Sequence, residues 1–518
     1  MTPIQFRLDE RAAGILVHPT SLPGPFESGD LGPAAHAFVD FLASCGLRWW
    51  QMLPLGPVGH GHSPYASTSV FAGSDVLVSL ERLRDDGLLD PADSALAPVE
   101  ASARCDFGAS DTRREGALRR AFEKARGLEV ERRKLAAFGE EFAFWLDDYA
   151  TFAAVKRRLG DKPFFEWPEG LRRREQAALG SFAEAHAEEI AFEKFVQSRF
   201  WSDLRALVAY AHEKNVALMG DAPIYVAHDS AEVWAHPEIF QMGADGEPEH
   251  VAGVPPDAFS DEGQLWGNPL YDWGYLEKHG FGFWVARLQH QFRIFDAVRL
   301  DHFIGFSRYW AVARGEKSAK NGTFHPVPGD RLFEAVFRGL GPVQLVAEDL
   351  GIVTDEVRAL RDRFRLPGMS VLQFSFSPGR HAETSRPHRF PVRTIVYTGT
   401  HDNDTTAGWI GSAPEDASEG ARTQWQAERD FALKYLALDP ASPPSALAWD
   451  LVRAAFASHA QTAIVPVQDL LGLGRDARMN RPGIAGGNWS FRLLPGQLDE
   501  RLAAKVHDLA ELYGRTSA

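Results

Sequence analysis

The sequence has few of the features that mark secreted, membrane or nucleic-acid-binding proteins. It contains only two cysteines, Cys45 and Cys105, among 518 residues, which excludes a disulfide framework. It has no apolar run of the roughly 18 residues that a membrane-spanning helix needs. Acidic residues outnumber basic ones and give a formal net charge of -15, which repels phosphate backbones and anionic lipid headgroups. We therefore expect neither a nucleic-acid partner nor a membrane partner.

The first residues also lack the apolar core of a signal peptide, because Arg7, Asp9, Glu10 and Arg11 interrupt them. We therefore expect a cytoplasmic protein. The chain has no glycine-rich phosphate loop, and its histidines and cysteines do not show metal-ligand spacing. We expect no cofactor and no metal. The oligomeric state is left open by the sequence.

What the chain does contain is a series of short apolar runs, each followed by polar or Gly/Pro-rich residues. Buried parallel strands have this continuous apolar character. Segments rich in Ala, Leu, Glu and Arg separate the runs, as in β/α units. Eight units favour a closed (β/α)8 TIM barrel, of the α/β class, over an open doubly wound sheet. The predicted strands are Gly14–Val17, Arg48–Leu53, Val216–Met219, Ala297–Leu300, Val343–Ala347, Ser370–Phe374, Thr394–Tyr397 and Thr462–Val465.

The spacing of these runs is uneven. The long stretch between the second and third strands, residues 81–200, is dense in Arg, Glu and Ala and predicts a helical insertion subdomain. Residues 241–273 are rich in Gly and Pro but carry several aromatics, which predicts an ordered active-site loop insertion. Little sequence follows the last strand, so we expect no separate C-terminal β-domain. The whole chain, 1–518, is predicted to be one catalytic barrel.

Carboxylates follow four of the predicted strands. Asp221, Asp301, Glu348 and Asp402 each stand where a strand stops, and the active site of such a barrel lies at these ends. Packing gives no reason to gather like charges that raise one another's pKa. A site that needs one neutral acid and one ionised carboxylate does favour this arrangement. Retaining glycoside chemistry is such a case, with two carboxyls about 5–5.5 Å apart.

Each of these residues also has an ordinary structural explanation. Asp301 could pair with Arg299, two residues earlier on the same strand face. Glu348 could be a rim residue, and Asp349 next to it could cap a helix. Asp402 and Asp404 could be ordinary turn residues. The coincidence of acids at four strand ends outweighs these separate explanations and favours a catalytic site.

Longer strings along nearly the whole chain make the hypothesis specific. In this set and order they resemble the amylomaltase family, the 4-α-glucanotransferases or disproportionating enzymes, which are relatives of the α-amylase superfamily. The strings are His18–Gly24 (HPTSLPG), Trp50–Pro57 (WQMLPLGP), Ser63–Tyr65 (SPY), Trp145–Ala150 (WLDDYA), Met219–Tyr225 (MGDAPIY), Val251–Asp257 (VAGVPPD), Gln264–Tyr271 (QLWGNPLY), Arg299–Phe303 (RLDHF), Ala347–Gly351 (AEDLG), Thr400–Asp402 (THD) and Gly487–Trp489 (GNW).

The resemblance implies a role for each matching residue. Asp301 matches the catalytic nucleophile, Glu348 the general acid/base, and Asp402 the third carboxylate, which binds ring hydroxyls of the distorted donor sugar. Arg299 matches the cation that keeps the nucleophile ionised, an arrangement that general electrostatics also favours. The other substrate-binding residues that the resemblance implies are Tyr65, Asp221, Asp257, Trp266, His302, His401 and Asn488.

The chain departs from the common family pattern at three places. Ile304 stands where an arginine is usual, Ser74-Asp75 where Asn-Pro is usual, and Thr323-Phe324 replaces a bulkier aromatic pattern. The three carboxylates are unaffected, so the predicted reaction class is unchanged. Subsite preference and acceptor handling are left open.

We therefore predict a 4-α-glucanotransferase that moves α-1,4-glucan segments from a donor to the 4-hydroxyl of an acceptor sugar by a retaining double displacement. Its predicted partners are maltooligosaccharides and α-1,4-glucans. The alternative is an α-glucan hydrolase of the amylase type, which uses the same carboxylates. An aromatic loop over the cleft, such as 241–273, would exclude water and favour transfer. A non-catalytic glucan-binding protein would have lost a carboxylate, and none is lost.

Overall fold

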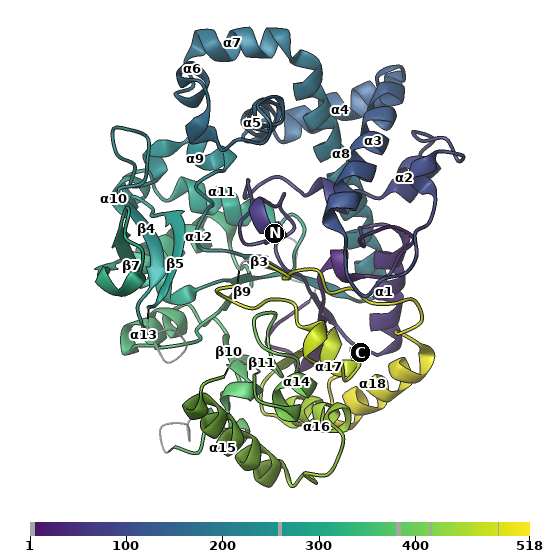
Figure 1. Cartoon of the computed structure of the whole chain (residues 1–518), viewed down its shortest axis with the longest axis vertical. Coiled ribbons are helices and arrows are strands. Elements are labelled where there is room, and N and C mark those ends of the chain that lie inside the picture. Colours follow the sequence, from purple (N-terminus) through teal and green to yellow (C-terminus); the bar gives the residue numbers. More distant parts are fainter. Residues whose placement is uncertain (1–5, 257–261, 380–384, 415–416, 485, 518) are drawn as a thin grey trace.

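The computed structural model describes residues 6–256, 262–379, 385–414, 417–484 and 486–517, and its centre is an eight-stranded parallel sheet. The strand order is β10-β11-β12-β1-β2-β3-β6-β9. The predicted (β/α)8 barrel is thereby confirmed, as a nearly closed sheet with helices around it (Figure 1). The strands are β1 Ala12–Leu16, β2 Trp49–Gln51, β3 Ala217–Ala222, β6 Ala297–Leu300, β9 Leu345–Ala347, β10 Gly368–Val371, β11 Thr394–Tyr397 and β12 Thr462–Pro466.

The seam between β9 and β10 is closed by a few contacts at the strand ends. Ala347 N donates to Pro367 O at 2.9 Å. One residue beyond Glu348, the Asp349 carboxylate accepts from Met369 N at 2.8 Å. Gly368 permits this approach, because a Cβ there would lie 2.6 Å from Asp349 Oδ2. Asp349 therefore links β9 to β10 across the seam and does not cap a helix.

All eight predicted strands overlap observed ones. The sixth differs most: β10 begins two residues before Ser370, and Leu372–Phe374 forms a 3-10 turn where a strand was expected. Leu372 and Gln373 are buried, so the apolar pattern continues past the end of the strand. Burial alone does not separate a strand from the turn that follows it.

Helices follow the strands around the outside of the barrel (Figure 1). They are α1 Pro33–Ser44, α9 Ala231–Ala235, α10 Trp273–Lys278, α11 Gly282–Gln291, α12 Gly329–Leu340, α13 Asp355–Arg363, α14 Thr406–Gly411, α15 Glu419–Leu436, α16 Pro444–Ala457, α17 Val467–Leu470 and α18 Glu500–Leu512. None of the helices in the described parts of the chain is both long and apolar enough to cross a membrane.

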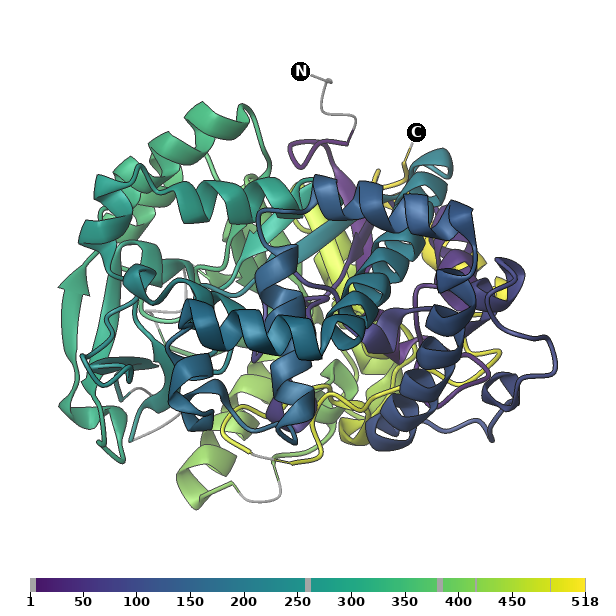
Figure 2. The same cartoon turned by 90° about the horizontal axis from the view of Figure 1, so that it is seen from above.

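The chain between β2 and β3 is mostly helical. Seen from above, these helices lie across the near side of the barrel (Figure 2). Gln197 ties the last of them to the loop after β2, accepting from Gly73 N at 2.8 Å and donating to Gly73 O at 2.9 Å. The treatment of 81–200 as a subdomain stays a prediction. The helices are α2 Leu80–Asp85, α3 Phe107–Arg126, α4 Glu129–Glu141, α5 Leu146–Arg158, α6 Glu169–Arg172, α7 Gln176–Ala185 and α8 Ala187–Glu213.

Residues 241–273 differ from the ordered loop that the sequence predicts, because they contribute two strands to a second sheet. This sheet is antiparallel, with the order β5-β4-β7-β8. Residues 257–261, which include the predicted substrate contact Asp257, lie outside the described residues. The strands are β4 His250–Val254, β5 Gln264–Pro269, β7 Arg308–Ala313 and β8 Thr323–Pro326.

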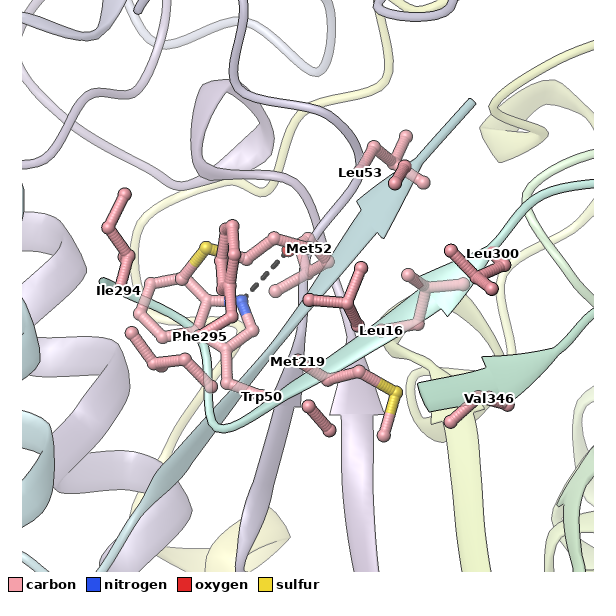
Figure 3. Packing of buried hydrophobic residues seen from close by; sticks show 14 of the residues in the cluster. Leu16, Trp50, Met52, Leu53, Met219, Ile294, Phe295, Leu300 and Val346 are labelled. Carbon is pink, nitrogen blue, oxygen red and sulfur yellow. Dashed lines mark hydrogen bonds between the residues drawn. The ribbon is translucent and has the colours of Figure 1, made fainter. Parts of the chain in front are cut away.

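Apolar side chains between the strands and the surrounding helices form the core. In Figure 3 the Trp50 indole lies among Met52, Ile294 and Phe295. Its Nε1 donates to Val17 O at 2.9 Å, so the polar atom is satisfied although the side chain is fully buried. The core therefore fixes β2 against β1, and with it the strand ends that carry the site.

Candidate active site

The ends of β3 and β6 place an arginine between two carboxylates. Asp221 and Arg299 face each other in the register of the two strands. Arg299 Nη1 donates to both oxygens of Asp221, at 2.8 and 2.7 Å, and Arg299 Nη2 lies 3.0 Å from Asp301 Oδ1. Tyr65 adds a hydrogen bond from its hydroxyl to Asp221 Oδ2 at 2.7 Å. The pairing of Arg299 with Asp301 is real, and it belongs to a larger network.

The Asp221–Arg299 pair at the centre of this network is almost sealed from solvent. Arg299 is 4% exposed and Asp221 3%. Burial raises the pKa of Asp221, against the opposing effect of Arg299. The pKa of Arg299 lies well above its usual range, because the charges of Asp221 and Asp301 outweigh the effect of burial on the guanidinium. A buried guanidinium held by two hydrogen bonds is a fixed positive charge. This charge lies within ion-pair distance of Asp301.

Glu348, at the end of β9, is held by backbone amides. His302 N donates to Glu348 Oε2 at 2.7 Å, and Leu350 N donates to Oε1 at 3.2 Å. Burial raises the pKa of Glu348 to about 8; the charge of Asp301 adds to this rise, and Arg299 opposes it. Glu348 is therefore protonated at neutral pH and has a proton to give.

The backbone at His302 has an unusual conformation. Its φ of 47° and ψ of 54° lie in the left-handed region, which few residues other than glycine adopt. The N–H of this residue is the one that donates to Glu348 Oε2. Burial lowers the pKa of His302 to about 4, so its imidazole is neutral at pH 7. Strain of this kind is often retained where a site needs it.

Asp402, after β11, is more open than the other carboxylates, with 46% of its side chain exposed. Its Oδ1 accepts from Asn480 Nδ2 at 2.6 Å and lies 3.3 Å from His401 Nε2. Its backbone carbonyl accepts from Arg478 Nη2 at 2.5 Å. The third carboxylate is thus held by side chains from a segment after β12.

Aromatic rings line both sides of the cluster. Tyr65 stacks on His401 with ring centroids 4.9 Å apart, and Trp489 lies 5.8 Å from Tyr65 and 5.9 Å from His401. Trp266, on β5, meets the edge of His302 at 4.9 Å and is 37% exposed. Carboxylates with aromatic rings beside them suit the binding of a sugar.

Comparison with known proteins identifies the family. A family model described as 4-alpha-glucanotransferase matches residues 17–497. The chain belongs to the 4-α-glucanotransferase family. The sequence is 46% identical over 511 residues to the 4-alpha-glucanotransferase of Thermus thermophilus, covering 98% of this chain and 99% of that one. It is 40% identical over 521 residues to the chloroplastic/amyloplastic 4-alpha-glucanotransferase of Solanum tuberosum, covering 98% and 87%.

Comparison of the fold with solved structures indicates the same family. The structure is similar to the amylomaltase from Streptococcus agalactiae in complex with acarbose, with a TM-score of 0.92 and 34% identity over 98% of this chain and 100% of that one. The predicted membership of the amylomaltase family and the predicted 4-α-glucanotransferase activity are confirmed. The chain is therefore an enzyme of the transferase class.

The structure brings together most of the residues predicted for the site. Asp221, Arg299, Asp301, Glu348 and Tyr65 with their neighbours His302, His401, Asp402 and Trp266 are linked by the contacts above. Asn488 is used differently: its Oδ1 accepts from Arg481 N at 2.9 Å and its Nδ2 donates to Ile484 O at 2.8 Å, which closes a turn. Its predicted contact with substrate is not tested by this arrangement.

Sequence reasoning missed Asn480 and Arg478 and assigned no role to Trp489. Asn480 stands 78 positions from its partner Asp402, so no local pattern joins them. Trp489 lies within the GNW string, and its φ of 65° is not visible in a sequence. In the ranges that the structure describes, no three His, Cys, Asp or Glu side chains are grouped to hold a metal ion.

The three departures from the family pattern lie in different parts of the chain. Ile304 is half-buried in the 3-10 turn Phe303–Phe306. Ser74 is buried beside the barrel. Phe324, on β8, is 43% exposed, with the Arg308 guanidinium 4.2 Å from its ring centroid. Their effect on donor and acceptor preference stays open.

Proposed function

We propose that this 4-α-glucanotransferase moves α-1,4-glucan segments between maltooligosaccharides by a retaining double displacement, with Asp301 as nucleophile and Glu348 as acid/base. One observation carries the assignment: the N–H of the residue after Asp301 donates to the Glu348 carboxyl at 2.7 Å. The two acids therefore flank one opening, with Arg299 behind Asp301. The acarbose complex of the similar amylomaltase supports an oligosaccharide ligand.

In the first step, Glu348 gives its proton to the glycosidic oxygen while the Asp301 carboxylate attacks the anomeric carbon. The bond from that carbon to the glycosidic oxygen breaks, and the cleaved fragment leaves as a neutral sugar. Asp301 is then an ester of the donor glucan. The raised pKa of Glu348 suits this role, because a general acid must hold its proton at working pH.

In the second step, Glu348 is a carboxylate and takes the proton of the acceptor 4-hydroxyl. The hydroxyl oxygen attacks the anomeric carbon and releases Asp301. The negative charge of Asp301 is absent in the ester, so one cause of the raised pKa of Glu348 disappears. The amides of His302 and Leu350 stabilise the ionised form. Two inversions give net retention.

The remaining residues bind and orient the sugars. Asp402 and Asp221 accept hydrogen bonds from hydroxyls, and the neutral imidazole of His302 and the ring of His401 complement them. Trp266 offers an exposed ring to the acceptor side. Tyr65, Arg299, Asp257 and Asn488 complete the proposed set. The cytoplasmic location and a reaction without metal or cofactor stay predictions.

The test is incubation with maltotriose alone, followed by chromatography of the products. We expect free glucose together with a ladder of longer maltooligosaccharides, while the total of reducing ends stays nearly constant. Water outnumbers any sugar, but a positioned acceptor reaches an effective concentration of roughly 10⁵ M or more. Products that are only shorter, with reducing ends rising in step, would show a hydrolase and overturn the proposal.

A further inference from the structure

The chain after β12 is attached to the Asp402 loop at several points. Asn480 N donates to His401 O at 3.0 Å, and Asn480 Nδ2 donates to Asp402 Oδ1 at 2.6 Å. Arg478 donates from Nη2 to Asp402 O at 2.5 Å and from Nε to Asn480 O at 2.7 Å. Main-chain contacts fix the two segments against each other. Among these contacts, the Asn480 amide is the one that reaches the Asp402 carboxylate itself.

Asp402 needs such a partner more than the other acids do. Glu348 is fixed by two backbone amides and Asp221 by Arg299, whereas 46% of the Asp402 side chain is exposed. An exposed carboxylate samples several rotamers unless a neighbour selects one. Asn480 and His401 both act on Oδ1, so this oxygen is directed toward the protein. Oδ2 is then the oxygen that remains for a sugar hydroxyl.

The chemistry of the amide fits the reaction. An asparagine donates a hydrogen bond without adding a positive charge next to the Asp402 carboxyl. The transition state of glycosyl transfer has oxocarbenium character, and a fixed carboxylate beside it is stabilising. A lysine or arginine in the same place would form an ion pair and reduce that effect.

We propose that Asn480 is a positioning residue of the transfer reaction, which holds Asp402 in one rotamer so that Oδ2 meets the hydroxyls of the donor sugar. The inference rests on the proposed role of Asp402. It assigns Asn480 no contact with the reacting atoms: its effect passes through Asp402.

The first experiment replaces the amide. Asn480→Ala should lower kcat for maltotriose about 10- to 100-fold, which is the usual effect of a hydrogen bond to a charged group. KM should change by less than about 3-fold, because the donor sugar is gripped most tightly in its distorted form. Arg481→Ala, the neighbouring and exposed position, is the matched control and should keep kcat within about 2-fold. Wild-type kcat in Asn480→Ala would overturn the inference.

A double-mutant cycle tests whether Asn480 acts through Asp402. In the Asp402→Ala background, the further change Asn480→Ala should lower kcat by less than about 2-fold, because the group it positions is already absent. Losses that multiply would show that Asn480 acts independently and would overturn the inference. An Asp402→Ala enzyme with wild-type turnover would instead show that the proposed function of Asp402 is wrong, and the inference would fall with it.

A third variant covers the case in which Asn480→Ala does not fold. Asn480→Asp keeps the shape and the main-chain contacts but sets two carboxylates side by side, which then share a proton. Asp402 also faces His401, Tyr65 and Arg478, and all three are unchanged in this variant. The acidic limb of the kcat profile should therefore move to higher pH. A loss that is equal at every pH would indicate structural damage alone and overturn the inference.

Discussion

The two sides of the active-site opening are built differently. On the side of β3, β6 and β9, Asp221 and Arg299 are at most 4% exposed, and Glu348 is held by backbone amides. On the side of β11 and the segment after β12, Asp402 is half exposed and is held by side chains. The first side is held by buried contacts at the strand ends. The second depends on contacts between loops.

The difference matches the division of tasks in the proposed mechanism. Bond making and breaking needs groups held to a fraction of an ångström, and strand ends supply such positions. Recognition of sugars of varied length needs surfaces that differ among relatives, and loops supply these. We therefore expect substitutions on the strand side to affect kcat most strongly. Substitutions on the loop side should lower kcat less, as expected for Asn480, which acts through the half-exposed Asp402.

The largest effect is expected at Asp301. Asp301→Asn keeps the shape of the side chain but removes the nucleophile, so kcat for maltotriose should fall about 10³-fold or more. The melting temperature should stay close to wild type, because Asp301 is partly exposed and Arg299 keeps its stronger partner Asp221. A variant that keeps more than about a tenth of wild-type turnover would lose far less than the removal of a catalytic group usually costs. That result would show that Asp301 is not the nucleophile.

A large but donor-dependent effect is expected at Glu348. Glu348→Gln should slow cleavage of maltotriose strongly and that of α-glucosyl fluoride much less, because fluoride leaves with little protonation. In the wild type, kcat/KM for maltotriose should fall as pH rises through about 8, where Glu348 loses its proton. This alkaline limb should be absent with the fluoride donor if cleavage limits the rate. Equal losses with both donors would show that Glu348 is not the acid.

The smallest effect is expected at Trp266, on β5. Trp266→Ala should lower the transfer rate only a few-fold, in line with loss of one ring contact of about 1 kcal/mol. It should raise the hydrolytic share, because in the proposed mechanism the exposed ring beside His302 excludes water from the acceptor side. The measurement is the ratio of new reducing ends to glucose released from maltotriose. An unchanged ratio would place acceptor recognition on another part of the molecule.

The barrel and its acids were predictable because both leave local signals. Buried parallel strands such as β11 and β12 are continuous apolar runs, and their ends are marked by polar residues. Once the strands are predicted, the positions of Asp301 and Glu348 at strand ends follow. The pairing of Arg299 with Asp301 was also readable, since positions two apart share a strand face.

The second sheet and Asn480 were not predictable for the opposite reason. Strands β5 and β8 are largely exposed, so they lack the apolar run that indicates a buried strand. Asn480 takes its meaning from Asp402, far away in the chain, and no spacing rule connects the two. The left-handed backbone at His302 likewise follows from the surrounding fold and from no property of histidine.

The neighbouring acids Glu348 and Asp349 show how closely catalysis and architecture are interleaved in this chain. One carboxyl faces the opening, and the other, one methylene shorter, joins β9 to β10 beside Gly368 and is also held by Arg361 at 2.5 Å. Exchanging the two side chains would leave composition, net charge and hydropathy unchanged. The enzyme would nonetheless lose reach at one position and gain a clash at the other, where a glycine already leaves no spare room. One exchange of neighbouring side chains, which alters no bulk property of the sequence, would therefore disturb both the chemistry and the closure of the barrel.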